Sequence, residues 1–202
     1  MSSSIPSSLV ALSSVAYFDL SYTQLTSSIP SWLSKLTSLR VLFLNGNKFT
    51  SSIPDSLGNL TSLQKFDLSN NPLTGSIPSN LVRLSFLMEL QLQNSQLTSS
   101  IPTWLSKLTS LHTIYLNGNH FTSTIPSSIG DLLGLVELSI FDNLLWGTIP
   151  NSFGPFIQLI DVHSNANITG SIPTSFGVLT TLARLSVAST GIGEYLLFIW
   201  FY

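Results

Sequence analysis

The chain has 202 residues, with 7 Lys and Arg against 9 Asp and Glu, 3 His and no Cys. This length suits one domain or one unbroken repeat array, and a net charge of −2 argues against binding nucleic acid, which requires a basic surface. The absence of cysteine excludes disulfides, thiolate zinc sites and a cysteine nucleophile. Only 8 % of the residues are charged while 44 % are hydrophobic, so the composition is not that of a disordered chain.

Neither a leader nor a membrane span is visible. The first six residues lack the basic start and apolar segment of a secretory signal. The longest uninterrupted apolar run covers the eight residues 195–202, whereas a spanning helix needs about 20. The sequence therefore predicts no complete membrane span in this chain and shows no signal peptide.

An Ile-Pro pair recurs along the whole chain. Its Ile lies at positions 5, 29, 53, 77, 101, 125, 149 and 172, with a spacing of 24 residues six times and then of 23. A fixed period of this size indicates a solenoid, in which each repeat stacks on its neighbours. We expect about eight 24-residue units over residues 1–194, followed by an apolar tail, 195–202, outside the repeat.

Each unit contains the same predicted elements. In the unit that begins at Ile53, Phe66 and Leu68 alternate with period two, which is typical of a strand with one buried face. Strands that recur in the same sense pair in parallel, with the rest of the unit as crossover. Proline keeps the preceding Ile extended and then starts a short helical or 3₁₀ turn, where its missing N–H is harmless.

An asparagine recurs where the chain turns away from each strand. A buried amide there can satisfy backbone groups of the neighbouring turn and form a ladder along the stack. Thr23, Ser95 and Thr190 replace it in three units and can do so only in part. The one-residue loss in the seventh unit is expected near Asn167. The predicted ladder positions are Asn47, Asn71, Asn119, Asn143 and Asn167.

These residues resemble the plant-type leucine-rich repeat, whose signature is LxxLxxLxLxxNxLxGxIPxxLxx. The match is fullest from Phe66 to Pro78. The resemblance implies an α/β fold: a right-handed, horseshoe-shaped solenoid with a concave parallel β-sheet and short 3₁₀ or helical segments on its convex side. The chain departs from the pattern because serine replaces the glycine of GxIP in most units and because it has no cap cysteines.

The resemblance also implies a function. Such arrays form ectodomains of receptor-like proteins and receptor kinases, and also related secreted inhibitors. The resemblance therefore implies that the chain is part of a longer, extracellular or cell-surface glycoprotein of the plasma membrane that acts in signal transduction, or part of a related secreted inhibitor. Its expected partner is a protein or peptide ligand, with a co-receptor as a further candidate. No cofactor is expected.

Residues that alternate with the buried leucines of each strand face solvent on the concave side. They combine aromatic side chains, which favour partner binding, with an acidic balance that suits a partner carrying basic groups. Alternatively, they form only a solvated sheet face. In the strand pattern xLxLx, the three solvent-facing x positions of successive units form three columns along the sheet. We expect His163 in the central column, Asp161 in the column before it and Phe141 in the column after it. The candidate ligand-binding residues are Asp19, Phe43, Asp67, Glu89, Gln91, Tyr115, Phe141 and His163.

No catalytic signature is present: the chain lacks GxSxG, a P-loop and HExxH, so we do not expect an enzyme. Glu137, Asp161 and His163 fall on adjacent predicted strands, but the set is loose and lacks a second histidine nearby. A plain charged cluster is the better interpretation, and no metal site is predicted.

A Thr-x-Ser pattern beside the second, shorter strand suggests an alternative function. Its threonines and serines should point to solvent in rows about 4.8 Å apart, which resembles the surface of ice-binding solenoids. An exposed edge strand also favours these residues without any ligand, and a structural spacer is a third possibility. The threonines are Thr26, Thr50, Thr74, Thr98, Thr122 and Thr169, with Trp146 as the one break.

Two glycosylation sequons occur. Asn59 falls on the convex turn and should be accessible to a glycan. Asn167 occupies a predicted buried ladder position, so we assign it a structural role.

Overall fold

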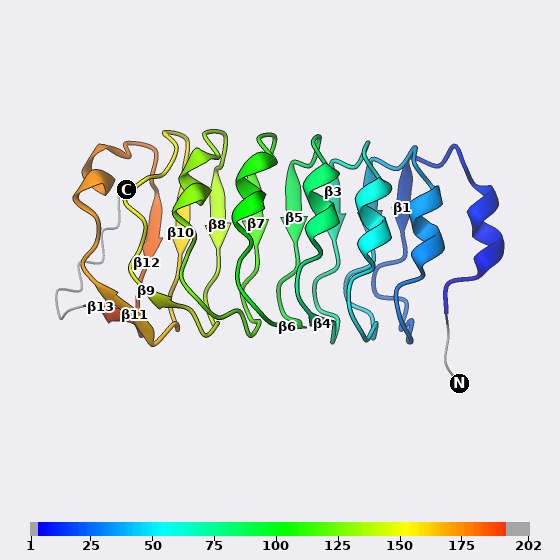
Figure 1. The fold of residues 1–202 in the computed structure, drawn as a ribbon, viewed down its shortest axis with the longest axis horizontal. Coiled ribbons are helices and arrows are strands. Elements are labelled where there is room, and N and C mark those ends of the chain that lie inside the picture. Colours follow the sequence, from blue (N-terminus) through cyan, green and yellow to red (C-terminus); the bar gives the residue numbers. More distant parts are fainter. Residues whose placement is uncertain (1–3, 193–202) are drawn as a thin grey trace.

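A computed structural model describes residues 4–192 of the chain. The coils stack along one axis, with the first coil at one end and the last at the other (Figure 1). Neighbouring strands of each sheet contact one another, and so do consecutive 3₁₀ segments from Ser7–Ala11 to Ser127–Asp131. The predicted leucine-rich repeat solenoid is therefore confirmed, while the predicted tail, 195–202, lies outside the described residues.

One eight-stranded parallel sheet runs the length of the array, in the order β1-β2-β3-β5-β7-β8-β10-β12. We call its outward surface the concave face. Every strand is three residues long and most alternate between a buried centre and more exposed flanks. The strands are β1 (Tyr17–Asp19), β2 (Val41–Phe43), β3 (Lys65–Asp67), β5 (Glu89–Gln91), β7 (Thr113–Tyr115), β8 (Glu137–Ser139), β10 (Leu159–Asp161) and β12 (Arg184–Ser186).

All helical segments among residues 4–192 are five-residue 3₁₀ helices that begin directly after a proline. In each, the proline is extended, as at Pro54 with φ −64° and ψ 128°, because the ring fixes φ and the turn does not need its N–H. The segments are η1 (Ser7–Ala11), η2 (Ser31–Lys35), η3 (Asp55–Asn59), η4 (Ser79–Arg83), η5 (Thr103–Lys107), η6 (Ser127–Asp131) and η7 (Thr174–Val178).

A second set of short parallel strands lies on one flank, which we call the lateral face. These strands are β4 (Thr74–Gly75), β6 (Gln96–Leu97), β9 (Trp146–Gly147), β11 (Asn167–Gly170) and β13 (Gly191–Ile192). Isolated bridges between Ser28 and Thr50 and between Ser100 and Thr122 continue the pattern where no strand is formed.

The core is a continuous column of leucine, isoleucine and phenylalanine. In the third coil, Leu57, Leu60, Leu63 and Phe66 are all at most 1 % exposed. Burial of such side chains stabilises each coil by about 1.5–3 kcal/mol per side chain. Because one coil cannot bury these residues alone, the stack as a whole is the folding unit.

The asparagine ladder forms as predicted in most coils. The side-chain nitrogen of Asn71 donates to the carbonyl oxygens of Leu44, Leu68 and Ser69 at 3.0–3.1 Å. Its side-chain oxygen accepts the backbone N–H of Phe49 at 3.0 Å. One amide therefore satisfies backbone groups of its own coil and of the preceding one.

The seventh coil differs from the prediction. Leu159 pairs with Glu137, 22 residues earlier, and with Arg184, 25 residues later, whereas the other coils pair at intervals of 24. No 3₁₀ helix follows Pro150. The chain instead turns tightly at Gly154, where a Cβ atom would lie only 2.7 Å from the carbonyl oxygen of Leu133.

The predicted position of the loss and the ladder role of Asn167 are consequently wrong. Two residues are missing before the strand of the seventh coil, and one extra residue follows this strand. Asn165 is fully buried and donates to the carbonyl oxygens of Ile140 and Val162 at 3.1 and 2.9 Å. Asn167 is exposed on β11.

The residue two places before each Ile-Pro pair adopts a left-handed backbone. Gly75 has φ +79°, and the serines that replace this glycine have φ values of 69–76°. A side chain in this conformation costs about 1–2 kcal/mol relative to glycine. The fold therefore accepts mild strain at Ser27, Ser51, Ser99 and Ser123.

Replacing Asn71 by alanine tests the ladder. Asn71→Ala leaves the N–H of Phe49 and the carbonyl of Leu44 without these partners in the core, so we expect a loss of about 1–3 kcal/mol in the free energy of unfolding. Urea denaturation measures this loss. The control Asn80→Ala, at an exposed position on η4, should leave the midpoint within experimental error, and an unchanged midpoint for Asn71→Ala would contradict the ladder.

Candidate functional site

The concave face carries the predicted binding residues, and the shorter seventh coil rearranges them. Asp161 pairs with Ser139 and Ser186 and thus occupies the central column. The N–H of Asp142 donates to the carbonyl of His163, so His163 lies beside Phe141 in the following column. The columns predicted for Asp161 and His163 from the period of 24 are therefore wrong. Each residue lies one column further along, because the seventh coil is two residues shorter before its strand.

The first half of the face combines aromatic side chains with carboxylates. Asp19, Phe43 and Asp67 are directly paired neighbours on β1, β2 and β3. The ring of Tyr17 meets that of Phe43 edge-on, with 5.9 Å between the centroids and 77° between the planes. We call Tyr17, Asp19, Phe43 and Asp67 the acidic half.

The two carboxylates of the acidic half differ in environment. Hydrogen bonds from the hydroxyl and the backbone N–H of Ser21, at 2.6 and 2.9 Å, lower the pKa of Asp19. Burial raises the pKa of Asp67, although the backbone N–H of Ser69 donates to it at 2.9 Å. Within residues 4–192 neither carboxylate takes part in an ion pair, so both negative charges remain available to a partner.

Glu89 is partly neutralised. Its carboxylate lies 2.7 Å from the ammonium group of Lys65 on the adjacent strand. Gln91, the last residue of β5, lies in the central column and is half-buried between Asp67 and Tyr115. Both residues mark the middle of the face, where the local charge is close to zero.

The second half of the face is aromatic, and its charges are paired internally. The rings of Phe141 and His163 stack with centroids 4.2 Å apart and planes at 13°. Asp161 is 2 % exposed and lies 2.5 Å from Nδ1 of His163 and 3.4 Å from the guanidinium of Arg184. The hydroxyl of Tyr115 donates to Glu137. We call Tyr115, Phe141 and His163 the aromatic half.

This pairing also bears on the possible metal cluster. Asp161 and His163 are in contact, but Glu137 is engaged by Tyr115. No group of three histidine or acidic side chains suited to a metal ion occurs in the part of the chain that the structure describes.

Sequence reasoning identified the candidate residues but missed their neighbours. Tyr17, Lys65 and Arg184 each contact a candidate or its partner, and their columns were visible in the sequence. Asp161 was placed one column away from its observed position. Only the register of the seventh coil, which the period does not reveal, puts its carboxylate beneath the aromatic half.

The hydroxyl rows of the lateral face are exposed but not straight. Ser28 lies beside Thr50, Ser100 beside Thr122, and Thr74 beside Gln96. At these positions of the lateral face, neighbouring coils therefore pair at an offset of 22 residues, whereas most of their strands in the eight-stranded sheet pair at 24. A two-residue slip places equivalent threonines about 7–8 Å apart, so the expected rows at about 4.8 Å are not formed.

Both sequon asparagines are exposed. Asn59 ends η3, and its side-chain oxygen accepts a hydrogen bond from Arg83 at 2.9 Å. Asn167 stands on β11 beside Trp146 of β9, and Trp146 is itself 52 % exposed. The structural role assigned to Asn167 is therefore wrong.

The fold and the repeated ladder define a leucine-rich repeat protein. A family model described as leucine rich repeat matches residues 13–73 and 61–121, which together make up more than half of the chain. The chain belongs to the leucine-rich repeat family. Among curated proteins, no significant sequence match was found.

Solved plant receptor ectodomains have the same fold. One is the ectodomain of the Arabidopsis thaliana membrane receptor kinase GASSHO1/SCHENGEN3, in complex with CASPARIAN STRIP INTEGRITY FACTOR 2. Its TM-score is 0.89 at 36 % identity, over 95 % of this chain and 23 % of that one. Another is the Arabidopsis receptor kinase HAESA, in complex with the peptide hormone IDA and the co-receptor SERK1. Its TM-score is 0.90 at 34 % identity, over 95 % of this chain and 32 % of that one.

A plant ice-binding protein is also similar, with a TM-score of 0.76 at 24 % identity, over 96 % of this chain and 70 % of that one. At this identity the likeness shows the fold alone. The chain spans about a quarter to a third of the two receptor ectodomains. Among residues 4–192, no helix has the length and apolarity needed to cross a bilayer.

Tyr115 provides a spectroscopic test of the aromatic half. Burial, together with the hydrogen bond to Glu137, raises its pKa from 10.0 to about 12. The folded state therefore favours the protonated phenol: this stabilisation is complete below about pH 10 and is lost as the pH rises through about 12. Titration of tyrosine absorbance should show a late phenol that Tyr115→Phe removes. Glu137→Gln should bring the pKa of Tyr115 closer to 10, and a titration curve that Tyr115→Phe leaves unchanged above about pH 11 would contradict the assignment.

Proposed function

We propose that the chain is a non-catalytic recognition module that binds a peptide or protein ligand on its concave face. The observation that carries the proposal is the division of this face into an acidic half and an aromatic half. Two carboxylates that form no ion pair among residues 4–192 flank Phe43, while the charges near Phe141 and His163 are already paired.

This division specifies the chemistry of the ligand. A lysine or arginine of the ligand would place its cation near Asp19 and Asp67, with its aliphatic stem over the ring of Phe43. An apolar or aromatic residue further along would pack on Tyr115, Phe141 and His163, which are rigid aromatic anchors. Glu89 and Gln91 lie between the two and would contact backbone groups of an extended ligand.

The related receptors support the same proposal. GASSHO1/SCHENGEN3 is solved with CASPARIAN STRIP INTEGRITY FACTOR 2, and HAESA is solved with a peptide hormone and a co-receptor. We infer for this chain an extracellular place as part of a longer receptor-like protein of the plasma membrane, acting in signal transduction without catalysis of its own. A co-receptor would then contact the ligand or the rim of the array.

Selection from a random-peptide display library tests the proposal. Peptides that bind the chain should be enriched in lysine and arginine. Their affinity should fall at least about tenfold in the variant Phe43→Ala/Tyr115→Ala/Phe141→Ala, because aromatic anchors dominate such interfaces. The matched control Thr50→Ala/Thr74→Ala/Thr98→Ala, on the lateral face, should bind as the wild type does.

A separate variant tests the role of the two carboxylates of the acidic half. Asp19→Asn/Asp67→Asn should weaken basic peptides and leave uncharged ones unchanged. Equal binding to the aromatic variant and the wild type would overturn the concave assignment. The absence of any selected peptide would instead favour a structural spacer.

Ice binding would use the lateral face and leave a different signature. Thermal hysteresis that is lost in Thr74→Tyr/Thr98→Tyr would support it against the recognition proposal. The two-residue slip between coils removes the straight rows on which that idea was based, so we expect no hysteresis in either protein.

We also propose N-glycosylation of Asn59 and extend it to Asn167, since both acceptor amides are exposed. Secretion from a eukaryotic host should add glycan mass at each site, and Asn59→Gln and Asn167→Gln should each remove one increment. Asn151→Gln, an exposed asparagine outside any sequon, is the control. An unmodified wild-type chain from the same host would refute the proposal.

A further inference from the structure

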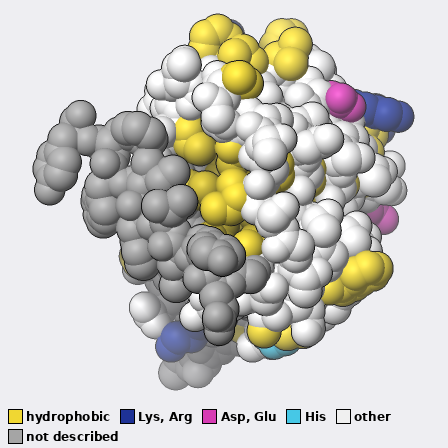
Figure 2. All heavy atoms as spheres, turned by 90° about the vertical axis from the view of Figure 1, so that its left-hand side faces the viewer, with side chains coloured by type: hydrophobic (Ala, Val, Ile, Leu, Met, Phe, Trp, Pro, Cys, Tyr) yellow, Lys and Arg dark blue, Asp and Glu magenta, His cyan; other side chains and the backbone are white. Residues whose placement is uncertain are grey.

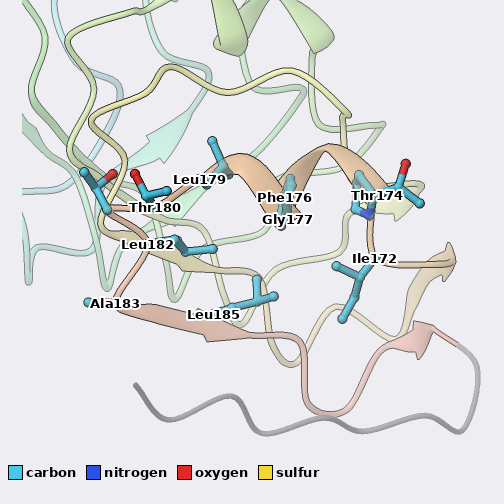
Figure 3. Close-up of a pocket in the computed structure, with 11 residues that line it drawn as sticks. Ile172, Thr174, Phe176, Gly177, Leu179, Thr180, Leu182, Ala183 and Leu185 are labelled. Carbon is cyan, nitrogen blue, oxygen red and sulfur yellow. The ribbon is translucent and has the colours of Figure 1, made fainter. Parts of the chain in front are cut away.

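A cavity of about 730 Å³ opens at the last described coil. Figure 3 shows Ile172, Leu182 and Leu185 projecting into the space between η7 and β12. These three side chains pack against the hydrophobic core, and Figure 2 shows hydrophobic side chains gathered at this end of the molecule. This cavity therefore belongs to the core of the array, and we assign no ligand to it.

A second cavity lies in the middle of the array and has a different lining. It is formed by two successive coils, at the starts of η5 and η6, and its volume is about 580 Å³. Small-ligand pockets typically have volumes of about 300–1,000 Å³. Among residues 4–192, no charged side chain lines it. We call it the tryptophan cavity, because Trp104 lines it together with Pro102, Pro126 and six serines and threonines.

The fold does not require a tryptophan at position 104. Two residues after the proline of each Ile-Pro pair, six of the eight coils have serine or asparagine. Ser56 and Ser128 at this position donate to the carbonyl oxygens of Ser31 and Thr103 in the preceding coil, at 3.3 and 3.2 Å. Trp104 has no hydroxyl and cannot form this bond. The repeat therefore accepts a small polar residue here, and neither its pattern nor its hydrogen bonds explain the indole ring.

The polar groups of the tryptophan cavity are largely unpaired. Of the six serines and threonines that line it, only Ser128 forms a side-chain hydrogen bond within residues 4–192. The indole N–H of Trp104 has no partner in the same part of the chain. Each hydroxyl can both donate and accept a hydrogen bond, whereas the indole only donates. The cavity thus combines one aromatic ring with several hydroxyls that are free to bind a ligand.

We propose that the tryptophan cavity binds a neutral carbohydrate. One face of a pyranose ring carries C–H groups, which pack favourably on the negative face of an indole ring. The edge of the same sugar carries hydroxyls, which both donate to and accept from serine and threonine. An uncharged ligand also matches a lining without charged side chains. The tryptophan cavity shares no residue with the acidic or aromatic half, so this ligand is additional to the one proposed for the concave face.

A proline-rich peptide is the competing ligand, because it also packs on aromatic rings. Such peptides bind in grooves lined by several aromatic side chains, whereas Trp104 is the one aromatic residue that lines this cavity within residues 4–192. Proline has no backbone N–H to donate, so the hydroxyl oxygens would lack donors from such a ligand. A carbohydrate supplies both donors and acceptors and therefore fits the lining better.

Calorimetric titration with neutral oligosaccharides tests the proposal. Cellohexaose, maltohexaose and mannohexaose would each be added to the full chain at up to about 10 mM, because one stacked ring with a few hydrogen bonds gives millimolar affinity. At least one of the three should bind. Trp104→Ala should weaken this binding at least about tenfold. The matched control Phe86→Ala removes an exposed aromatic side chain outside the cavity and should bind as the wild type does.

A second variant keeps the tryptophan, which packs partly against the core. Ser127→Tyr, at an exposed position of the lining, should fill the cavity and weaken binding without lowering the melting temperature. Ser7→Tyr, at the same position of the first coil, is its control and should bind normally. The concave variant Phe43→Ala/Tyr115→Ala/Phe141→Ala should also bind the oligosaccharide normally, so this test is separate from that of the concave face.

Three results would overturn the proposal. The first is that none of the three oligosaccharides binds the wild type. The second is that binding survives both Trp104→Ala and Ser127→Tyr, which would place the sugar elsewhere. The third is that decaproline binds in place of the oligosaccharides and is lost in Trp104→Ala, which would assign the cavity to a proline-rich peptide.

Discussion

The buried asparagine after each strand is the interaction on which the architecture depends. At this point the backbone leaves the sheet, and its polar groups would otherwise lie in an apolar core without partners. The amide of Asn71 or Asn119 contacts carbonyl oxygens of two successive coils and one N–H of the earlier coil. Each coil therefore fixes the position of the next, and the rigid concave face follows from that order.

The fourth coil shows what happens without this amide. Ser95 is buried at the ladder position, and its hydroxyl has no hydrogen-bond partner. The N–H of Leu73, which an asparagine would have bound, donates instead to the carbonyl of Asn71 at 2.7 Å. Thr23 and Thr190 recover one bond each, to the carbonyl three residues earlier. The joint at Ser95, near the middle of the array, is thus the least well satisfied.

Most of the fold could be predicted from the sequence. The period of 24 indicates stacked coils, and the alternating apolar residues indicate a strand with one buried face. The seventh coil could not be predicted in this way, since the loss of one residue between Ile149 and Ile172 is the sum of two residues removed before the strand and one added after it. Phe153, Ile157 and Leu159 fit either alignment by hydrophobicity alone. The alignment that the seventh coil adopts depends on Gly154. Because glycine has no Cβ atom, its backbone can lie against that of Leu133, and no hydrophobic pattern in the sequence predicts this contact.

The proposed binding face was predictable to the same degree. Alternation placed Asp19, Phe43 and Asp67 correctly because their coils keep the period. It could not show that Asp161 is buried beneath His163 and paired with Arg184, because that arrangement depends on the shifted register. The result changes the interpretation of the face from acidic on balance to acidic at one end only.

The left-handed serines have a consequence for how such a chain can evolve. Ser27, Ser51, Ser99 and Ser123 are held at positive φ, where glycine relieves strain, and they lie on the lateral flank, away from the sheet that would contact a ligand. Single-codon changes there could add stability without touching recognition, and proteins tolerate new, destabilising surface residues only while they retain such a margin. The scaffold thus has room to acquire altered ligand specificity.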